Sequence, residues 1–201
     1  MEQKHSYLAL GDSYTIGEAV PEENRWPVLL ADLLNEAGKP FDQPRIIAKT
    51  GWTTSELATA IQQADIRDTF DLVTLLIGVN NQYRGNDPEE YRNEFRDLLK
   101  RAVSFAGGKT THVVVVSIPD WGVTPFAEGR DRTEIAAKID LFNTINRKES
   151  EQQQVRYVDI TAGSRQAAAD SELTASDGLH PSGKMYKQWA EAVYSAVASQ
   201  Y

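Results

Sequence analysis

The chain has 201 residues, the size of one ordinary domain. Hydrophobic residues make up 41%, charged residues make up 25%, and the mean hydropathy is −0.46. Such a chain can bury a full core and is neither a disordered tail nor a membrane protein. Its 21 basic and 29 acidic residues give a net charge of −8, which argues against a nucleic-acid partner. Because cysteine is absent, hydroxyl, carboxylate and imidazole groups remain for catalysis.

The N-terminal residues indicate no targeting segment in the chain as written. Met1 to Ser6 are polar, no apolar segment with a cleavage site follows, and no run of 18 apolar residues occurs. We therefore expect no stable membrane insertion and a cytoplasmic location; removal of a secretory leader would make the protein periplasmic or secreted. The oligomeric state is not predicted by composition.

Short apolar runs alternate with longer segments of helical periodicity, a pattern typical of β-α units around a parallel sheet. The expected strands are Tyr7 to Leu10, Arg45 to Ala48, Leu72 to Ile77, His112 to Ser117 and Val155 to Ile160. The expected helices are Arg25 to Ala37, Thr53 to Ala64, Pro88 to Ala106, Thr133 to Gln153 and Ser182 to Ser199. A long loop, Pro119 to Arg132, follows the fourth strand. We predict one α/β domain over residues 1–201, a three-layer α/β/α sandwich with a five-stranded parallel sheet.

Four short segments of turn-forming and polar residues stand where chemistry is expected. Three follow the first three strands: Gly11 to Gly17, Lys49 to Trp52 and Gly78 to Asn81. The fourth, Asp177 to Pro181, precedes the last helix. Ligands of parallel sheets bind beyond the carboxyl ends of the strands, so these segments predict a site at that edge.

Ser13 is the candidate nucleophile, although Gly-Asp-Ser after a strand is also an ordinary turn. Of the three histidines, His5 and His112 belong at the amino edge of the sheet, so His180 is the candidate base. Asp177 lies three residues before His180, a spacing that lets its carboxylate accept a hydrogen bond from the imidazole. The alternatives are a polar loop histidine and an Asx turn.

An anionic intermediate on Ser13 needs hydrogen-bond donors already in place. The available donors are the backbone N–H at Ser13, the N–H of Gly51 and the side-chain amide of Asn80. Each of these residues alone is also explained as a turn or a capped loop. Their joint occurrence with a candidate base favours the catalytic interpretation.

Substrate contacts are expected from Trp52 beside the oxyanion glycine, from Asn81, and from Trp121 and Phe126 in the long loop. The alternative is that these aromatic residues cover the core. No stretch is long enough to build a large apolar lid, so we expect a shallow acyl pocket and a preference for short acyl esters.

Taken together, these segments resemble the sequence blocks of the GDSL or SGNH hydrolases. Gly11-Asp12-Ser13-Tyr14 is similar to the first block, Gly51 to the second, Gly78-Val79-Asn80-Asn81 to the third, and Asp177-Gly178-Leu179-His180-Pro181 to the last. The sequence has Tyr14 where the family name implies Leu, and Asn81 where members often carry Asp. The resemblance extends from residue 7 to the C-terminal helix.

The resemblance implies a flavodoxin-like fold with Ser13, Asp177 and His180 as the catalytic triad and Gly51 and Asn80 completing the oxyanion hole. It implies a lipase-like acylhydrolase that cleaves small-molecule carboxylic esters without metal or cofactor. The activities left open are simple esterase, lysophospholipase, thioesterase and carbohydrate O-deacetylase. A non-catalytic flavin or nucleotide module is the remote alternative, since the glycine-rich phosphate-binding patterns are missing. Asp12, Asp120 and Asp177 stand near the expected site, but zinc sites are built mainly from His and Cys ligands. With one histidine there and no cysteine, a zinc site is not expected.

Overall fold

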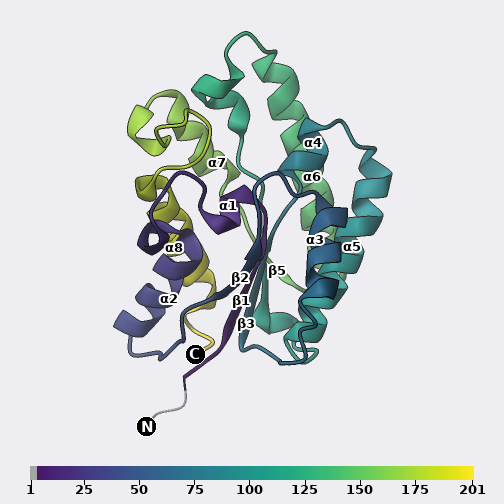
Figure 1. Ribbon diagram of the computed structural model, residues 1–201, viewed down its shortest axis with the longest axis vertical. Coiled ribbons are helices and arrows are strands. Elements are labelled where there is room, and N and C mark those ends of the chain that lie inside the picture. The colour runs from purple at the N-terminus through teal and green to yellow at the C-terminus, as the bar shows by residue number, and fades with distance from the viewer. Residues whose placement is uncertain (1–3) are drawn as a thin grey trace.

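The computed structural model describes residues 4–201, whose five strands form one parallel sheet in the order β2-β1-β3-β4-β5 (Figure 1). The strands are β1 (Tyr7–Gly11), β2 (Arg45–Ala48), β3 (Leu72–Leu76), β4 (Val113–Val116) and β5 (Arg156–Val158). All residues of β1, β3 and β4 are buried, as near-continuous apolar strands covered on both faces should be. The predicted α/β/α architecture with five parallel strands is confirmed.

Helices cover the two faces of this sheet, as Figure 1 shows. On one face lie α2 (Trp26–Glu36) and α8 (Gly183–Val197), which pack against each other. On the other lie α3 (Thr54–Gln63), α5 (Pro88–Phe105) and α6 (Arg132–Gln152). The apolar stripe of α5 is buried as its spacing predicts. Within residues 4–201 no helix is long and apolar enough to cross a membrane.

The sequence pattern misses three short helices: α1 (Ser13–Ile16), α4 (Val79–Tyr83) and α7 (Thr161–Ser164). Segments of four or five residues contain too few positions to display a helical period. The loop after β4 also contains two 3₁₀ turns, Trp121–Val123 and Pro125–Ala127. The first two of these helices, α1 and α4, begin just beyond β1 and β3. They carry Ser13 and Asn80, two of the predicted site residues.

The last strand is shorter than the predicted Val155 to Ile160. Beyond Val158 the chain turns away from the sheet, because the N–H groups of Ile160 and Thr161 donate to the Ser117 hydroxyl at 2.8 and 3.2 Å. A side chain here replaces the backbone partner that would have continued the strand.

Gly78, which caps the start of α4, has φ of +126° in a crowded position. A Cβ there would overlap the Tyr91 hydroxyl and lie 2.8 Å from Ile118 Cδ1. The Tyr91 hydroxyl is itself held between the Ile77 carbonyl at 3.1 Å and Asn146 Oδ1 at 2.7 Å. Neither neighbour can withdraw without breaking these contacts, so the chain needs glycine at this position.

We expect Gly78→Ala to lower the free energy of unfolding by roughly 2 to 5 kcal/mol, because backbone strain and overpacking add. The matched control is Gly85→Ala, where φ is +72° but no atom lies within 4 Å of the new Cβ. That variant should lose only about 1 kcal/mol, from strain alone. Urea unfolding of both variants measures the difference, and equal losses would contradict the crowding argument.

Candidate active site

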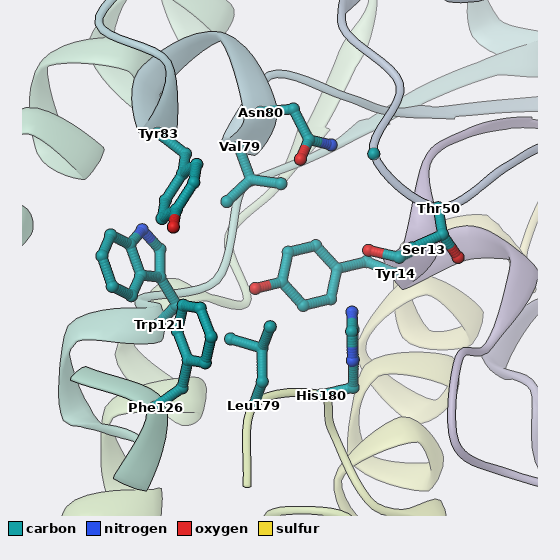
Figure 2. A pocket seen from close by; sticks show the side chains of 11 residues that line it. Ser13, Tyr14, Thr50, Val79, Asn80, Tyr83, Trp121, Phe126, Leu179 and His180 are labelled. Carbon is teal, nitrogen blue, oxygen red and sulfur yellow. The ribbon is translucent and has the colours of Figure 1, made fainter. Parts of the chain in front are cut away.

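The parallel register brings three of the four segments to one edge of the sheet. The last residue of β1, Gly11, pairs with Ala48 of β2 and with Leu76 of β3, so the chain leaves all three strands side by side. The fourth segment, Asp177 to Pro181, meets them there through His180, which lines the same cavity as Ser13 (Figure 2). This cavity has a volume of about 180 Å³.

Ser13 is the first residue of α1 and is 5% exposed. Asp12 caps this helix, and its Oδ1 accepts a hydrogen bond from the Tyr14 N–H at 3.0 Å. The first N–H groups of a helix have no partner inside the helix, and the Ser13 N–H finds no acceptor among residues 4–201. One residue therefore offers both a hydroxyl and an unpaired donor to the cavity.

The Asp177 carboxylate holds the His180 ring. Asp177 Oδ2 lies 2.6 Å from His180 Nδ1, while Oδ1 accepts the N–H groups of Leu179 and His180, each at 3.0 Å. Partial burial works to raise the pKa of the Asp177 carboxyl, but these hydrogen bonds hold it below its usual value. An ionised Asp177 keeps the Nδ1 proton and leaves Nε2 free on the opposite side of the ring.

Gly51 and Asn80 line the cavity together with Ser13 and His180. Gly51 has φ of +86°, a conformation that favours glycine, and its N–H has no acceptor within the described residues. The Asn80 amide donates one hydrogen to the Trp52 carbonyl at 2.9 Å, which leaves the second hydrogen of the same nitrogen available. Three donors from three elements thus lie at one cavity.

The other two histidines lie away from this cavity, as their place in the sequence predicts. His5 precedes β1 and His112 precedes β4, at the amino edge of the sheet. Both rings pack near the ring of Tyr201, with centroids 5.1 and 6.1 Å away.

The four predicted substrate contacts divide into two groups. Trp121 and Phe126 line the cavity, the first 4% and the second 42% exposed. Trp52 and Asn81 are not among the lining residues of the described chain. These two side chains contact other parts of the protein instead.

Asn81 points into the protein and is 1% exposed. Its Oδ1 accepts the Thr54 N–H at 3.0 Å and its Nδ2 donates to Thr54 Oγ1 at 2.7 Å, so it fastens the start of α3. The Trp52 ring packs against the hydrophobic core, and only its carbonyl takes part in the site. Neither side chain lines the cavity, and their predicted substrate contacts stay predictions.

Five further residues line the cavity that sequence reasoning did not single out: Tyr14, Thr50, Val79, Tyr83 and Leu179. Four of them stand next to a predicted site residue, and Tyr83 stands one helical turn after Asn80 on α4. Their position next to the motif residues is therefore the feature of the sequence that could have predicted them. Tyr14 packs edge-on against the His180 ring at a centroid distance of 5.7 Å.

The carboxylates near the site do not form a cluster. Asp120 pairs with Arg165 at 2.9 Å, and Asp177 is engaged with His180. Asp12 is fully buried, its Oδ2 has no partner among the described residues, and burial raises the pKa of its carboxyl from 3.8 to about 7. Among residues 4–201 no three histidine or acidic side chains are grouped as a metal site would require. Independence from metal and cofactor stays a prediction.

Comparison with known proteins identifies the family of the chain. Residues 9–188 match the GDSL-like lipase/acylhydrolase family. An arylesterase of Vibrio mimicus is 29% identical over 189 residues, which cover 92% of this chain and 84% of the relative. The family match spans all four segments of the site.

Similar solved structures share the fold. The structure of TesA has a TM-score of 0.75 at 16% identity, and the alignment covers 98% of this chain and 99% of TesA. Axe2, an acetylxylan esterase from Geobacillus stearothermophilus, has a TM-score of 0.72 at 19% identity, with 96% of this chain and 94% of Axe2 covered. At such identities the similarity concerns the arrangement of helices and strands.

Asp12→Asn should change how stability depends on pH. In the folded protein the raised pKa of Asp12, about 7, keeps this carboxyl protonated at pH values where the unfolded chain has already lost the proton. Its contribution to stability is therefore complete below about pH 4 and falls by up to about 1.4 kcal/mol per pH unit until about pH 7. The asparagine oxygen still caps α1 but carries no charge, so urea unfolding at pH 5, 6 and 7 should show a flatter profile for the variant. Parallel profiles would contradict the assignment.

Proposed function

The chain belongs to the GDSL-like lipase/acylhydrolase family and is a carboxylic ester hydrolase, and we propose that it cleaves short acyl esters through an acyl-enzyme on Ser13. The observation that carries the proposal is the 2.6 Å contact between Asp177 and a His180 ring that lines the same cavity as Ser13. A carboxylate, an imidazole and a hydroxyl in this order are the parts of a serine triad.

In the proposed acylation step the Ser13 oxygen attacks the ester carbonyl while His180 Nε2 takes its proton. The carbonyl oxygen becomes an anion, which the N–H groups of Ser13 and Gly51 and the Asn80 amide stabilise. When the anion collapses, the imidazolium protonates the departing alkoxide and the acyl group remains on Ser13. Asp177 stabilises the imidazolium throughout.

Deacylation repeats these steps with water as the nucleophile. His180 takes a proton from water, the resulting hydroxide attacks the acyl carbonyl, and the same donors receive the second oxyanion. Collapse returns the proton to Ser13 and releases the carboxylic acid. Each proton passes through one nitrogen, so the reaction needs no further acid or base.

The cavity walls support a preference for short acyl chains. Tyr83, Trp121 and Phe126 form an aromatic wall, and the Trp121 ring is fixed because its Nε1 donates to Gln82 Oε1 at 2.8 Å. The Arg130 guanidinium braces this wall, with Cζ between 5.1 and 5.3 Å from the three ring centroids. A wall held in this way limits how far an acyl chain can extend.

The leaving group defines the substrate class. The name of the Vibrio mimicus relative, an arylesterase, supports aryl esters as substrates for this chain as well. Thioesters, lysophospholipids and acetylated sugars would use the same nucleophile and base. Turnover of an acyl-CoA, a lysophospholipid, an acetylated xylo-oligosaccharide and p-nitrophenyl acetate, compared at equal concentration, distinguishes these substrate classes.

Ser13→Ala and His180→Ala should each lower kcat for p-nitrophenyl acetate by on the order of 10³-fold or more, because triad members act as a unit. The control is His112→Ala, which removes an imidazole at the opposite edge of the sheet and should leave kcat unchanged. Circular dichroism checks that the variants are folded. A folded, uncontaminated Ser13→Ala protein with half of the original kcat would refute the acyl-enzyme mechanism.

Among p-nitrophenyl esters from acetate to palmitate, kcat/KM should peak at about two to six acyl carbons. Each buried methylene contributes about 0.8 kcal/mol while the pocket has room, and the gain ends where the chain meets the aromatic wall. A maximum at about ten carbons or beyond would show a deep channel in place of this wall and would favour a lipase or a lysophospholipase.

A further inference from the structure

The oxyanion residues Gly51 and Asn80 are linked through helix α4. This helix carries Asn80, and Arg84, four residues later, caps its C-terminal end in helical conformation, a spacing that puts both side chains on one face. Asn80 Nδ2 donates to the Trp52 carbonyl at 2.9 Å, and Arg84 Nη2 donates to the Gly51 carbonyl at 2.6 Å. One helix therefore holds two successive carbonyls of the loop that follows β2.

The residue before Gly51 is held from another direction. The Thr50 hydroxyl donates to the Glu18 carboxylate, which lies in the loop after α1. Residues 50, 51 and 52 thus each make a hydrogen bond to a side chain of another segment, Thr50 to the loop after α1 and the other two to α4 and its C-cap. The backbone on both sides of Gly51 is restrained, although glycine itself has the greatest conformational freedom of any residue.

The Arg84 guanidinium has its own anchor. Its Nη1 lies 3.3 Å from Glu56 Oε2, and Glu56 also accepts the Thr53 N–H at 2.8 Å as part of the capping box of α3. The Arg84 and Glu56 side chains are 48% and 44% exposed, so this ion pair is screened and adds little to the stability of the fold. The ion pair instead holds the guanidinium in the position from which it donates to the Gly51 carbonyl.

We propose that Arg84 is a positioning residue that fixes the backbone at Gly51 so that its N–H points at the oxyanion of the ester-cleavage step. The inference rests on the proposed function and adds a residue that does not itself touch the substrate. A donor in the oxyanion hole is effective only at about 2.7 to 3.1 Å from the developing anion, and losing one costs about 10² to 10³-fold in kcat. Loosening a donor costs less than deleting it, because some of the molecules still hold the correct geometry.

The experiment compares Arg84→Met, Arg84→Lys and a matched control, Arg101→Met. Arg101 is also an exposed arginine that donates to a backbone carbonyl, that of Ala58 in α3 at 3.1 Å, and neither residue lines the cavity. Steady-state hydrolysis of p-nitrophenyl acetate gives kcat and KM, and thermal unfolding gives Tm. Arg84→Met should lower kcat by about 10-fold with KM changed by less than about 2-fold, because the lost interaction acts on the transition state.

Arg84→Lys should recover part of kcat, since lysine keeps the charge and one donor nitrogen but not the forked geometry. Arg101→Met should match the unsubstituted protein in kcat, and the Tm of Arg84→Met should stay close to that of Arg101→Met. A fall in kcat with unchanged Tm supports positioning, whereas an unchanged kcat, or a rise in KM alone, overturns it.

Glu56→Gln provides a second variant that leaves Arg84 in place. Glutamine can complete the capping box but cannot form the ion pair, so kcat should fall by a smaller factor, about 2- to 5-fold, with KM unchanged. A Glu56→Gln protein as fast as the original would contradict the anchoring role of this ion pair, and with it the positioning role of Arg84.

A phosphonate probe separates this inference from the proposed function. A p-nitrophenyl alkylphosphonate transfers its phosphonyl group to a nucleophilic serine and releases p-nitrophenolate, and the phosphoryl oxygen needs the same donors. Ser13→Ala should not react, and Arg84→Met should react about 10-fold more slowly than Arg101→Met. Reaction of Ser13→Ala would overturn the proposed function, while equal rates for Arg84→Met and Arg101→Met would overturn only the role of Arg84.

Discussion

The parallel pairing of β1 with β2 and β3 is the constraint on which the candidate site depends. Because Gly11 pairs with both Ala48 and Leu76, the segments that follow these strands start side by side. The last segment reaches the same edge by a different route, through an antiparallel bridge between Thr174 and Pro181. A one-residue shift in either register would turn the side chains of the shifted strand to the opposite face of the sheet.

The electrostatics of the site are local and do not follow from the charge of the chain. The net charge is −8, yet the proposed reaction forms an anion, so the stabilising groups have to be close to the reacting carbon. In the proposed reaction, backbone N–H groups and an amide fulfil this requirement, because such donors are oriented before the charge develops. Hydrogen bonds hold the pKa of Asp177 below its usual value despite its burial. The buried Asp12 has one oxygen without a partner among residues 4–201, and burial raises the pKa of its carboxyl to about 7.

Two neighbouring asparagines on α4 show why residue type alone did not define the site. Asn80 faces the cavity and Asn81 faces Thr54 in the interior, because successive residues of a helix point about 100° apart. The pattern Gly-Val-Asn-Asn contains no helical period, so nothing in it shows which amide turns outward. Similarly, Trp52 follows Gly51 in the sequence, but its ring is half-buried and packs against the core, and its carbonyl accepts from Asn80.

The sequence by itself determined the five strands, the long helices and the edge of the sheet at which Ser13, Gly51, Asn80 and His180 meet, because apolar periodicity and strand ends are local properties of the chain. It also selected His180 over the other histidines, since chain order relative to the strands decides the edge. Only the tertiary structure showed that aromatic side chains around Trp121 line the cavity and that Asn81 bonds Thr54. It also showed the hydrogen bond from Arg84 to the Gly51 carbonyl. Those features depend on side-chain direction and on contacts between residues distant in sequence, which no local pattern records.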